Sequence, residues 1–336
     1  MSIRSRLLVT VTTLSTWAGD MRFAHSAPAL QEYVRREYAE LHLGVTVRIV
    51  LYAPDDSAAR AAARAAYARI AELEDIMSDY RPESEVRRLA ERPHTPVRVS
   101  EPLFTVLGRA LELARRSDGA FDPTVGPFVE LWRRARRTGR LPSRAELDSA
   151  ARRVGWRKVR TDSASRSIRL DASGMRLDLG GIAKGYILDE ALLLLRRHGV
   201  TRALLQAGGD IVAGDPPPQA DAASGRAGWR VDVPGAGAVV RERAAALANA
   251  ALAVSGDAEQ FVIVDGVRYS HVIDPRTGLG LTNGRQATVV ADDGITADGL
   301  ATALTVLDAA RAVALLRAYP GVIADVRAST SESAGP

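Results

Sequence analysis

The sequence predicts an α+β fold, because strand-like and helix-like segments are mixed along it without the strict alternation that builds a parallel sheet. Apolar residues alternate from Val45 to Leu51, which is the period of a half-buried strand. An alanine-rich run then extends toward Ile76 behind Asp55-Asp56-Ser57, whose side chains are good helix N-caps. Asp265-Gly266 stands between two strand-like runs and is the strongest hairpin signal in the chain.

The remaining segments follow in chain order from their apolar patterns and turn residues. Helices are expected at residues 102–116, 144–147 and 186–198, and Gly199 is placed to end the last of them. Strands are expected at residues 156–159, 168–170, 203–206, 229–233 and 260–264. Proline, alanine and glycine dominate residues 215–228, which predicts an exposed loop. A hydrophobic content of 46% over 336 residues is ample for a folded core.

Charge and cysteine content exclude several kinds of protein. The net charge is +5, but 40 acidic residues are interspersed with 45 basic ones, so nucleic-acid binding is not expected. The chain has no cysteine, which excludes disulfides, iron–sulfur clusters and thiolate zinc sites. Any bound metal must therefore use oxygen or histidine ligands.

Lysine is rare here, since only Lys158 and Lys184 accompany the arginines among the 45 cationic residues. A compact ammonium and a broad guanidinium are not interchangeable. Lys184 is therefore a functional candidate on composition alone.

The N-terminal 27 residues resemble a secretory signal peptide. Arg4 and Arg6 precede an apolar, threonine-diluted run at residues 7–14, and small residues follow at 24–27. The run is too short and too polar for a permanent membrane helix. The expectation is an exported, periplasmic or otherwise extracytoplasmic protein. The alternative is a translation start at Met21, which would leave the protein in the cytoplasm.

Residues 177–186 combine a strand end, the glycine pair Gly180-Gly181 and a helix start that carries Lys184. Backbone without Cβ atoms can approach a ligand closely, and a helix N-terminus favours phosphate. The glycine spacing of a P-loop is missing. A tight structural turn would explain the glycines but not the rare lysine, so a phosphate contact is favoured.

Four other segments suggest a site only in combination. Residues 77–85 contain Tyr80. Residues 119–127 carry Phe121, which is suited to stacking, and Asp122, which is suited to hydrogen bonding. Residues 206–210 follow a strand and end in Gly208-Gly209-Asp210, and residues 269–278 place His271 before a turn with an aspartate and an arginine. Each could equally be an ordinary helix stop or turn.

Asp298 and Thr302 are four residues apart at a predicted helix start and so share one face. A carboxylate and a hydroxyl are hard oxygen ligands of the kind magnesium accepts. The structural alternative is an acidic residue stabilised by the helix dipole.

Taken together and in this order, the segments resemble the ApbE family of FAD:protein FMN transferases, over about residues 43–307. The most specific matches are Asp178 to Tyr186, Ser270 to Gly278 and Ala297 to Thr302. The resemblance implies a two-lobed, T-fold-like α+β architecture of mixed sheets and helices. We expect one such domain over residues 28–330, followed by a flexible tail at 331–336.

The resemblance also implies roles for individual residues. FAD would be contacted by nine of them: Leu43, Tyr80, Ala120, Phe121, Asp122, Asp178, Lys184, His271 and Val272. Mg²⁺ would be held by the Gly181 carbonyl, Asp298 and Thr302. His271, Asp274 and Lys184 would form the catalytic set, with His271 as the acid–base residue. Leu43-Gly44-Val45 replaces the family's usual Met-Gly-Thr, and Gly299 stands where alanine is common.

The implied activity is Mg²⁺-dependent transfer of FMN from FAD to a threonine or serine of an acceptor protein, for example one in a membrane complex, with release of AMP. The same residues would also serve an FAD pyrophosphatase that releases FMN and AMP. A third alternative is a flavin-binding protein without turnover. Self-modification is not expected, because residues 162–165 lack a threonine.

Overall fold

The computed structural model describes residues 32–218, 228–232, 244–256 and 261–328. The predicted signal peptide and C-terminal tail lie outside these ranges, as do most of the predicted loop at 215–228 and the terminal residues of two predicted strands, Val233 and Gln260.

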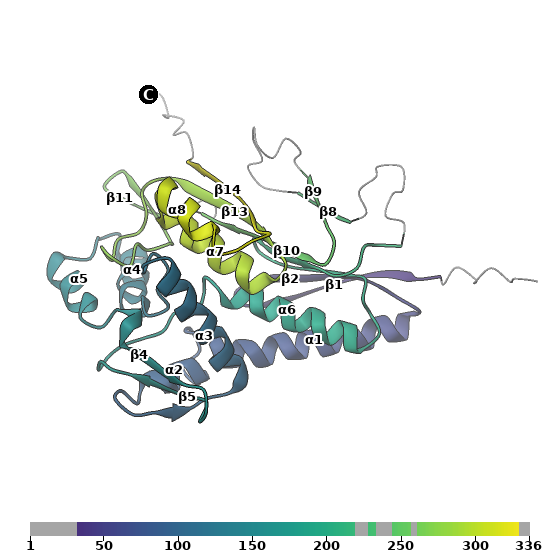
Figure 1. The fold of residues 1–336 in the computed structure, drawn as a ribbon, viewed down its shortest axis with the longest axis horizontal. Coiled ribbons are helices and arrows are strands. Elements are labelled where there is room, and N and C mark those ends of the chain that lie inside the picture. The colour runs from purple at the N-terminus through teal and green to yellow at the C-terminus, as the bar shows by residue number, and fades with distance from the viewer. Residues whose placement is uncertain (1–31, 219–227, 233–243, 257–260, 329–336) are drawn as a thin grey trace, which may run out of the picture. The chain divides into compact units, whose positions relative to one another are not determined.

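A seven-stranded sheet in the order β1-β2-β6-β7-β10-β13-β14 forms the centre of the fold (Figure 1). Its strands are β1 Val34–His42, β2 Val45–Ala53, β6 Ala203–Ala207, β7 Asp210–Ala213, β10 Ala250–Ser255, β13 Arg285–Ala291 and β14 Ile323–Ala328. Every neighbouring pair is antiparallel. The predicted α+β class is therefore confirmed, because no parallel βαβ unit contributes to this sheet.

Helices α1 (Asp56–Met77), α6 (Ala183–Arg197) and α7 (Gly294–Val306) cover one face of the sheet (Figure 1). Asp55 caps α1 as predicted, since its Oδ1 accepts the Ala58 N–H at 2.8 Å. Small buried alanines line α1, which lets this helix lie close to the sheet and to α6. In the described ranges, no helix is both long and apolar enough to cross a membrane.

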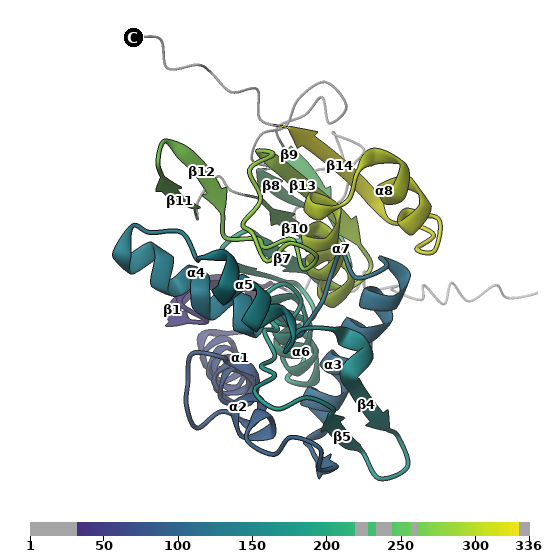
Figure 2. The ribbon, with the colours of Figure 1, turned by 90° about the vertical axis from the view of Figure 1, so that its left-hand side faces the viewer.

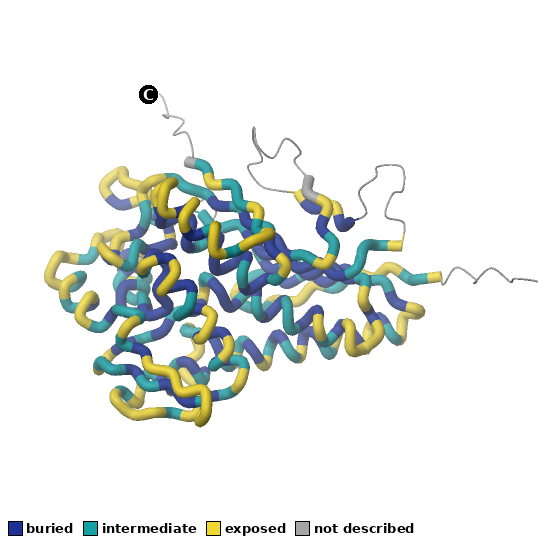
Figure 3. Tube along the Cα trace, viewed as in Figure 1, coloured by how far each residue is buried: buried dark blue, intermediate teal, exposed yellow. Residues whose placement is uncertain are grey.

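The sheet buries both faces, so its strands alternate between two cores (Figure 3). Val47, Ile49 and Leu51 pack toward the helices, whereas Val50 packs on the opposite face with Trp229. That opposite face is covered by the hairpin of β8 (Trp229–Asp232) and β9 (Ala244–Leu247).

The smaller elements lie around one end of the sheet (Figure 2). Helices are α2 Glu85–Ala90, α3 Glu101–Arg116, α4 Gly126–Thr138, α5 Arg144–Ala151 and α8 Ala309–Leu316. Strands are β3 Val97–Arg98, β4 Val159–Asp162, β5 Ser167–Leu170, β11 Phe261–Val264 and β12 Val267–Ser270. The predicted Asp265-Gly266 turn joins β11 to β12, with φ angles of 51° and 77° that suit a primed hairpin turn.

One predicted strand was placed too early. Residues 156–158 form a short 3₁₀ turn, and β4 begins only at Val159. The Trp156 N–H donates to the Asp122 carboxylate at 3.0 Å, which ties this segment to a distant loop and keeps it out of the sheet.

Helices α6 and α7 cross in close contact at two glycines. A Cβ on Gly185 would lie 2.0 Å from the Gly294 carbonyl oxygen. Asp189 of α6 also accepts the N–H groups of Gly294 and Ile295, at 2.8 and 3.0 Å. The start of α7 is thereby fixed to α6.

We expect Gly185→Ala to lower the free energy of unfolding by about 3 kcal/mol or more, because the added methyl group must push two helix backbones apart. Gly108→Ala in α3 is the matched control, since nothing lies within 4 Å of its added Cβ. That control should change stability by at most about 1 kcal/mol, in the stabilising direction. Urea unfolding of both variants makes the comparison, and equal stability would contradict the close crossing.

Candidate functional site

Several segments that the sequence singled out meet at one end of the sheet. Strand β2 begins there, after the Leu43-Gly44 turn, and β6 and β7 meet there at Gly208. Helix α1 ends and helix α6 begins at this end as well, because α1 runs antiparallel to β2 (Figure 1). Leu43 holds a left-handed φ of 55°, a strained conformation that is common at functional sites.

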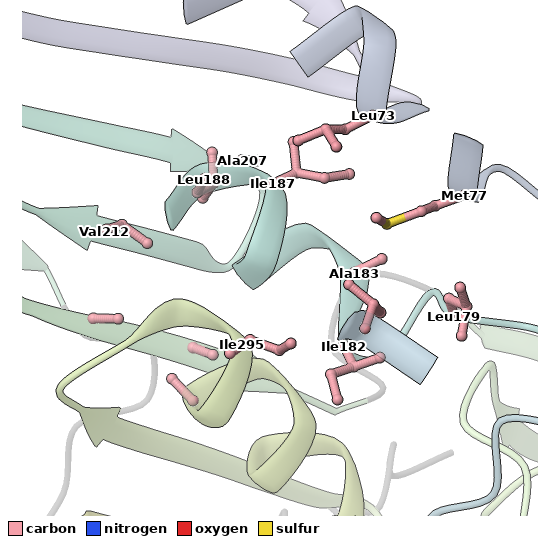
Figure 4. Close-up of a cluster of buried hydrophobic side chains, with 14 of the residues drawn as sticks. Leu73, Met77, Leu179, Ile182, Ala183, Ile187, Leu188, Ala207, Val212 and Ile295 are labelled. Atoms are coloured by element: carbon pink, nitrogen blue, oxygen red, sulfur yellow. The ribbon is translucent and has the colours of Figure 1, made fainter. Parts of the chain in front are cut away.

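Apolar side chains pack around the start of α6 and hold it in place (Figure 4). Leu179, Ile182 and Ala183 are all buried in the main core. They pack in one cluster with Met77 of α1 and Ile295 of α7. Gly180 and Gly181 between them, and Lys184 directly after them, are consequently held in place.

Lys184 and two aspartates form a buried charged cluster at this helix start. Its ammonium is hydrogen-bonded to Asp210, the first residue of β7. Asp298 lies close by, and its Oδ2 accepts the Gly185 N–H at 3.1 Å. Asp210 and Asp298 are only 2% and 4% exposed. Two buried carboxylates thus lie near one partly exposed ammonium, which is paired with Asp210.

The pKa values of both aspartates are raised, mainly because the carboxyl groups are buried. Burial, and then the neighbouring Asp210, raise the pKa of Asp298 to about 8. Burial also raises the pKa of Asp210, and Lys184 opposes that rise. One ammonium does not fully balance the two carboxylates, so an additional cation would be stabilised here.

The residues predicted to hold magnesium are next to each other. A Cβ on Gly181 would lie 2.8 Å from the Thr302 Oγ1, so this backbone directly faces the hydroxyl. Thr302 follows Asp298 by one helical turn of α7. Within the described ranges, no three His, Cys, Asp or Glu side chains are grouped to hold a metal by themselves. A carboxylate, a hydroxyl and a backbone carbonyl beside an excess of negative charge fit Mg²⁺, which keeps waters and substrate oxygens as its other ligands.

Asp178 and Tyr80 lie together on another side of the candidate site, here called the Asp178 wall. Burial and the nearby Asp79 raise the pKa of Asp178 to about 6, while the Gly180 N–H donates to its Oδ1 at 2.8 Å. Arg133 of α4 is hydrogen-bonded to Asp79, and its guanidinium carbon lies 3.8 Å from the centre of the Tyr80 ring.

Phe121, predicted to stack on a ligand, lies in the hydrophobic core of the structure. Ala120 and Phe121 are 3% and 5% exposed and belong to the main core. Asp122 is buried too, and its carboxylate accepts hydrogen bonds from Thr124 and from the Trp156 N–H. The Phe121 ring therefore packs in the apolar core, and the Asp122 carboxylate stabilises the loop through its hydrogen bonds. The Asp178 N–H donates to the Pro123 carbonyl at 2.8 Å, so the loop itself borders the site.

His271 comes from a third segment, directly after β12, and is exposed. Val272 behind it is buried and accepts the Leu281 N–H at 2.9 Å. Asp274 forms a bidentate ion pair with Arg276, with both contacts at 2.9 Å. Its carboxylate thus stabilises the turn that follows His271.

Asp79 and Arg133 were not among the residues predicted from the sequence. Asp210 was predicted only as part of a glycine turn. Asp210 carried little signal, because glycine and aspartate are common turn residues. Arg133 carried none, since it lies within a run of arginines.

The fold is an α+β protein with an antiparallel sheet covered on one face by three helices, and a charged cluster lies at the N-terminus of one of them. Residues 43–326 match the model of the ApbE family. The chain belongs to this family.

Characterised proteins agree with this assignment in sequence and in structure. A FAD:protein FMN transferase of Treponema pallidum (strain Nichols) is 34% identical over 304 residues, covering 85% of this chain and 83% of that protein. A crystal structure of the ApbE protein from Thermotoga maritima superimposes with a TM-score of 0.75 and 31% identity, covering 88% and 97% of the two chains. The flavin transferase ApbE from Vibrio cholerae gives a TM-score of 0.75 and 28% identity, covering 89% and 98%.

Proposed function

We propose that this protein is a Mg²⁺-dependent FAD:protein FMN transferase, which joins the FMN half of FAD to a threonine or serine of an acceptor protein and releases AMP. The observation that carries the proposal is the buried cluster of Lys184, Asp210 and Asp298 at the start of α6. Its position within the family's fold, and the names of the relatives, support FAD as the substrate.

The reaction exchanges a phosphoanhydride bond of FAD for a phosphoester bond to the acceptor. The acceptor hydroxyl oxygen forms a bond to the phosphorus of the FMN half, and the bond from that phosphorus to the bridging oxygen of AMP breaks. The hydroxyl proton passes to a base, and AMP leaves with the electron pair of the broken bond. Catalysis of this kind depends mainly on positioning and on stabilising the phosphate charge.

Each group of the site has a part in that exchange. The N-terminus of α6 and the Lys184 ammonium bind the pyrophosphate, because both favour anions. Asp298, the Thr302 hydroxyl and the Gly181 carbonyl hold Mg²⁺, which neutralises phosphate charge when it is bound. His271, exposed at its turn, accepts the proton of the incoming hydroxyl.

The decisive experiment incubates the purified protein with FAD, Mg²⁺ and a flavinylation domain that bears the target threonine. Covalent flavin on that domain, together with one AMP per flavin, is the expected result. Free FMN and AMP without labelling would replace the proposal with an FAD pyrophosphatase. FAD binding without any product would indicate a flavin-binding protein.

Export is a further part of the proposal, supported by Arg4, Arg6 and the apolar run after them. We expect the mature protein to begin after Ala27 and to meet its acceptor outside the cytoplasm, for example in a membrane complex. Mass spectrometry of the protein from its native cell gives the N-terminal residue. Finding an intact Met1 or Met21 there would contradict export.

A further inference from the structure

Arg133 contacts three side chains of the candidate FAD site at once. Its guanidinium is hydrogen-bonded to Asp79, lies 4.0 Å from the Asp178 Oδ2, and stacks at 3.8 Å over the ring of Tyr80. Asp79 and Tyr80 follow the end of α1, whereas Asp178 precedes α6. A single side chain of α4 therefore joins the two segments that form this wall.

Tyr80 is otherwise poorly held, since it is 72% exposed. The guanidinium covers one face of its ring. A tyrosine this exposed would exchange between rotamers without such a contact, and ordering it on binding would cost conformational entropy. Cation–π stacking holds the ring before the ligand arrives.

Arg133 also separates two like charges. Asp79 and Asp178 are both mostly buried, with side chains 16% exposed, and Asp79 disfavours the ionised form of Asp178. The guanidinium lies against both carboxylates and compensates their repulsion. Without it, the segments that carry Asp79 and Asp178 would be pushed apart.

The neighbouring residue on α4 fixes the other side of the site. Trp132 donates from its indole nitrogen to the Gly278 carbonyl at 2.8 Å, which holds the turn that follows His271. Its ring also contacts Tyr269 of β12, and Figure 2 shows β11 and β12 next to α4. Consecutive residues of one helix thus reach both the Asp178 wall and the His271 turn.

We propose that Arg133 is a positioning residue of the FAD site. It holds the Tyr80 ring and the Asp178 carboxylate in their binding arrangement and leaves only the opposite face of the Tyr80 ring for an aromatic ring of FAD. This inference rests on the proposed function, because it treats Tyr80 and Asp178 as FAD contacts.

The test compares Arg133→Gln and Arg133→Lys with Arg134→Gln. Arg134 is the matched control, since it lies next on the same helix and pairs with Glu146. FAD affinity is measured by flavin fluorescence in the presence of Mg²⁺. We expect Arg133→Gln to raise the Kd for FAD about tenfold, with a matching rise in KM and a change in kcat below about threefold. Arg133→Lys should recover part of the affinity, because an ammonium can still pair with one carboxylate.

A double-mutant cycle with Tyr80→Ala separates positioning from a general structural effect. If Arg133 acts partly through the tyrosine, Arg133→Gln should change the Kd clearly less in the Tyr80→Ala background than in the unchanged protein, and the remaining change reports its action through Asp178. Additive effects of the two substitutions, or an Arg133→Gln variant that binds FAD as the unchanged protein does, would overturn the inference. Loss of affinity in Arg134→Gln of the same size would overturn it as well. Failure of the unchanged protein to bind FAD would count against the proposed function instead.

Discussion

Asp298→Ala is expected to reduce FAD turnover about 10³-fold or more and to abolish saturable Mg²⁺ binding. Asp298 supplies the only charged side chain among the three expected metal ligands, and the neutral Thr302 hydroxyl and Gly181 carbonyl cannot replace it. The substitution should leave the fold intact, because Asp210 and Lys184 then form a balanced pair in the same cluster.

Three measurements check this expectation together. Calorimetry follows Mg²⁺ binding, chromatography follows AMP release, and thermal unfolding shows whether the variant is folded. Thr302→Val should be milder, at about tenfold in turnover, since a water molecule can replace one lost hydroxyl ligand. Asp292→Ala is the control, because this exposed aspartate lies just before α7. Full Mg²⁺-dependent turnover in Asp298→Ala would remove this residue from the metal site.

Lys184→Arg should lower the rate of FAD consumption about 10²-fold although it preserves the charge. The Lys184 ammonium occupies a narrow position against Asp210, at a helix start where Gly185 packs against Gly294. A planar guanidinium is wider than an ammonium, so it would displace either Asp210 or the bound pyrophosphate. Steady-state rates at saturating Mg²⁺ measure the effect.

Lys158→Arg is the control for this change, because Lys158 is the other lysine of the chain. Lys158 is more than a solvated surface residue, because its ammonium donates to the carbonyls of Arg152 and Val154 at 2.7 and 2.8 Å. It therefore caps the chain after α5, and its replacement should affect stability slightly and turnover hardly at all. Equal rates for the two arginine variants would mean that Lys184 is only a helix-start residue.

Local patterns predicted much of the fold. Helices α1, α3, α5 and α6 were expected within a few residues of their bounds, because caps and apolar periods are local properties. Five strands of the central sheet were not expected, namely β7, β10 and β13 in its interior and β1 and β14 at its edges. The two edge strands have a physical reason, and β1 in particular is polar along most of its length. An edge strand buries little, so it has no apolar pattern to reveal it.

The candidate site, like the fold, was predictable from the sequence only where its features are local. The sequence by itself determined which chemical groups are available: a rare lysine behind a glycine pair, an aspartate and a threonine four residues apart, and a histidine before a turn. Each is a short-range pattern, so it can be read without knowing where the rest of the chain lies.

Only the tertiary structure decided which groups meet. It paired Lys184 with Asp210, placed Asp298 beside them, and brought Arg133 onto Tyr80. It also turned Phe121 into the core, where the sequence had suggested a ligand contact. These contacts join residues that are far apart in the chain, and they depend on strand register and on how closely α6 and α7 can cross. Local periodicity carries no information about either, because both are fixed only when the whole sheet and its helices pack together.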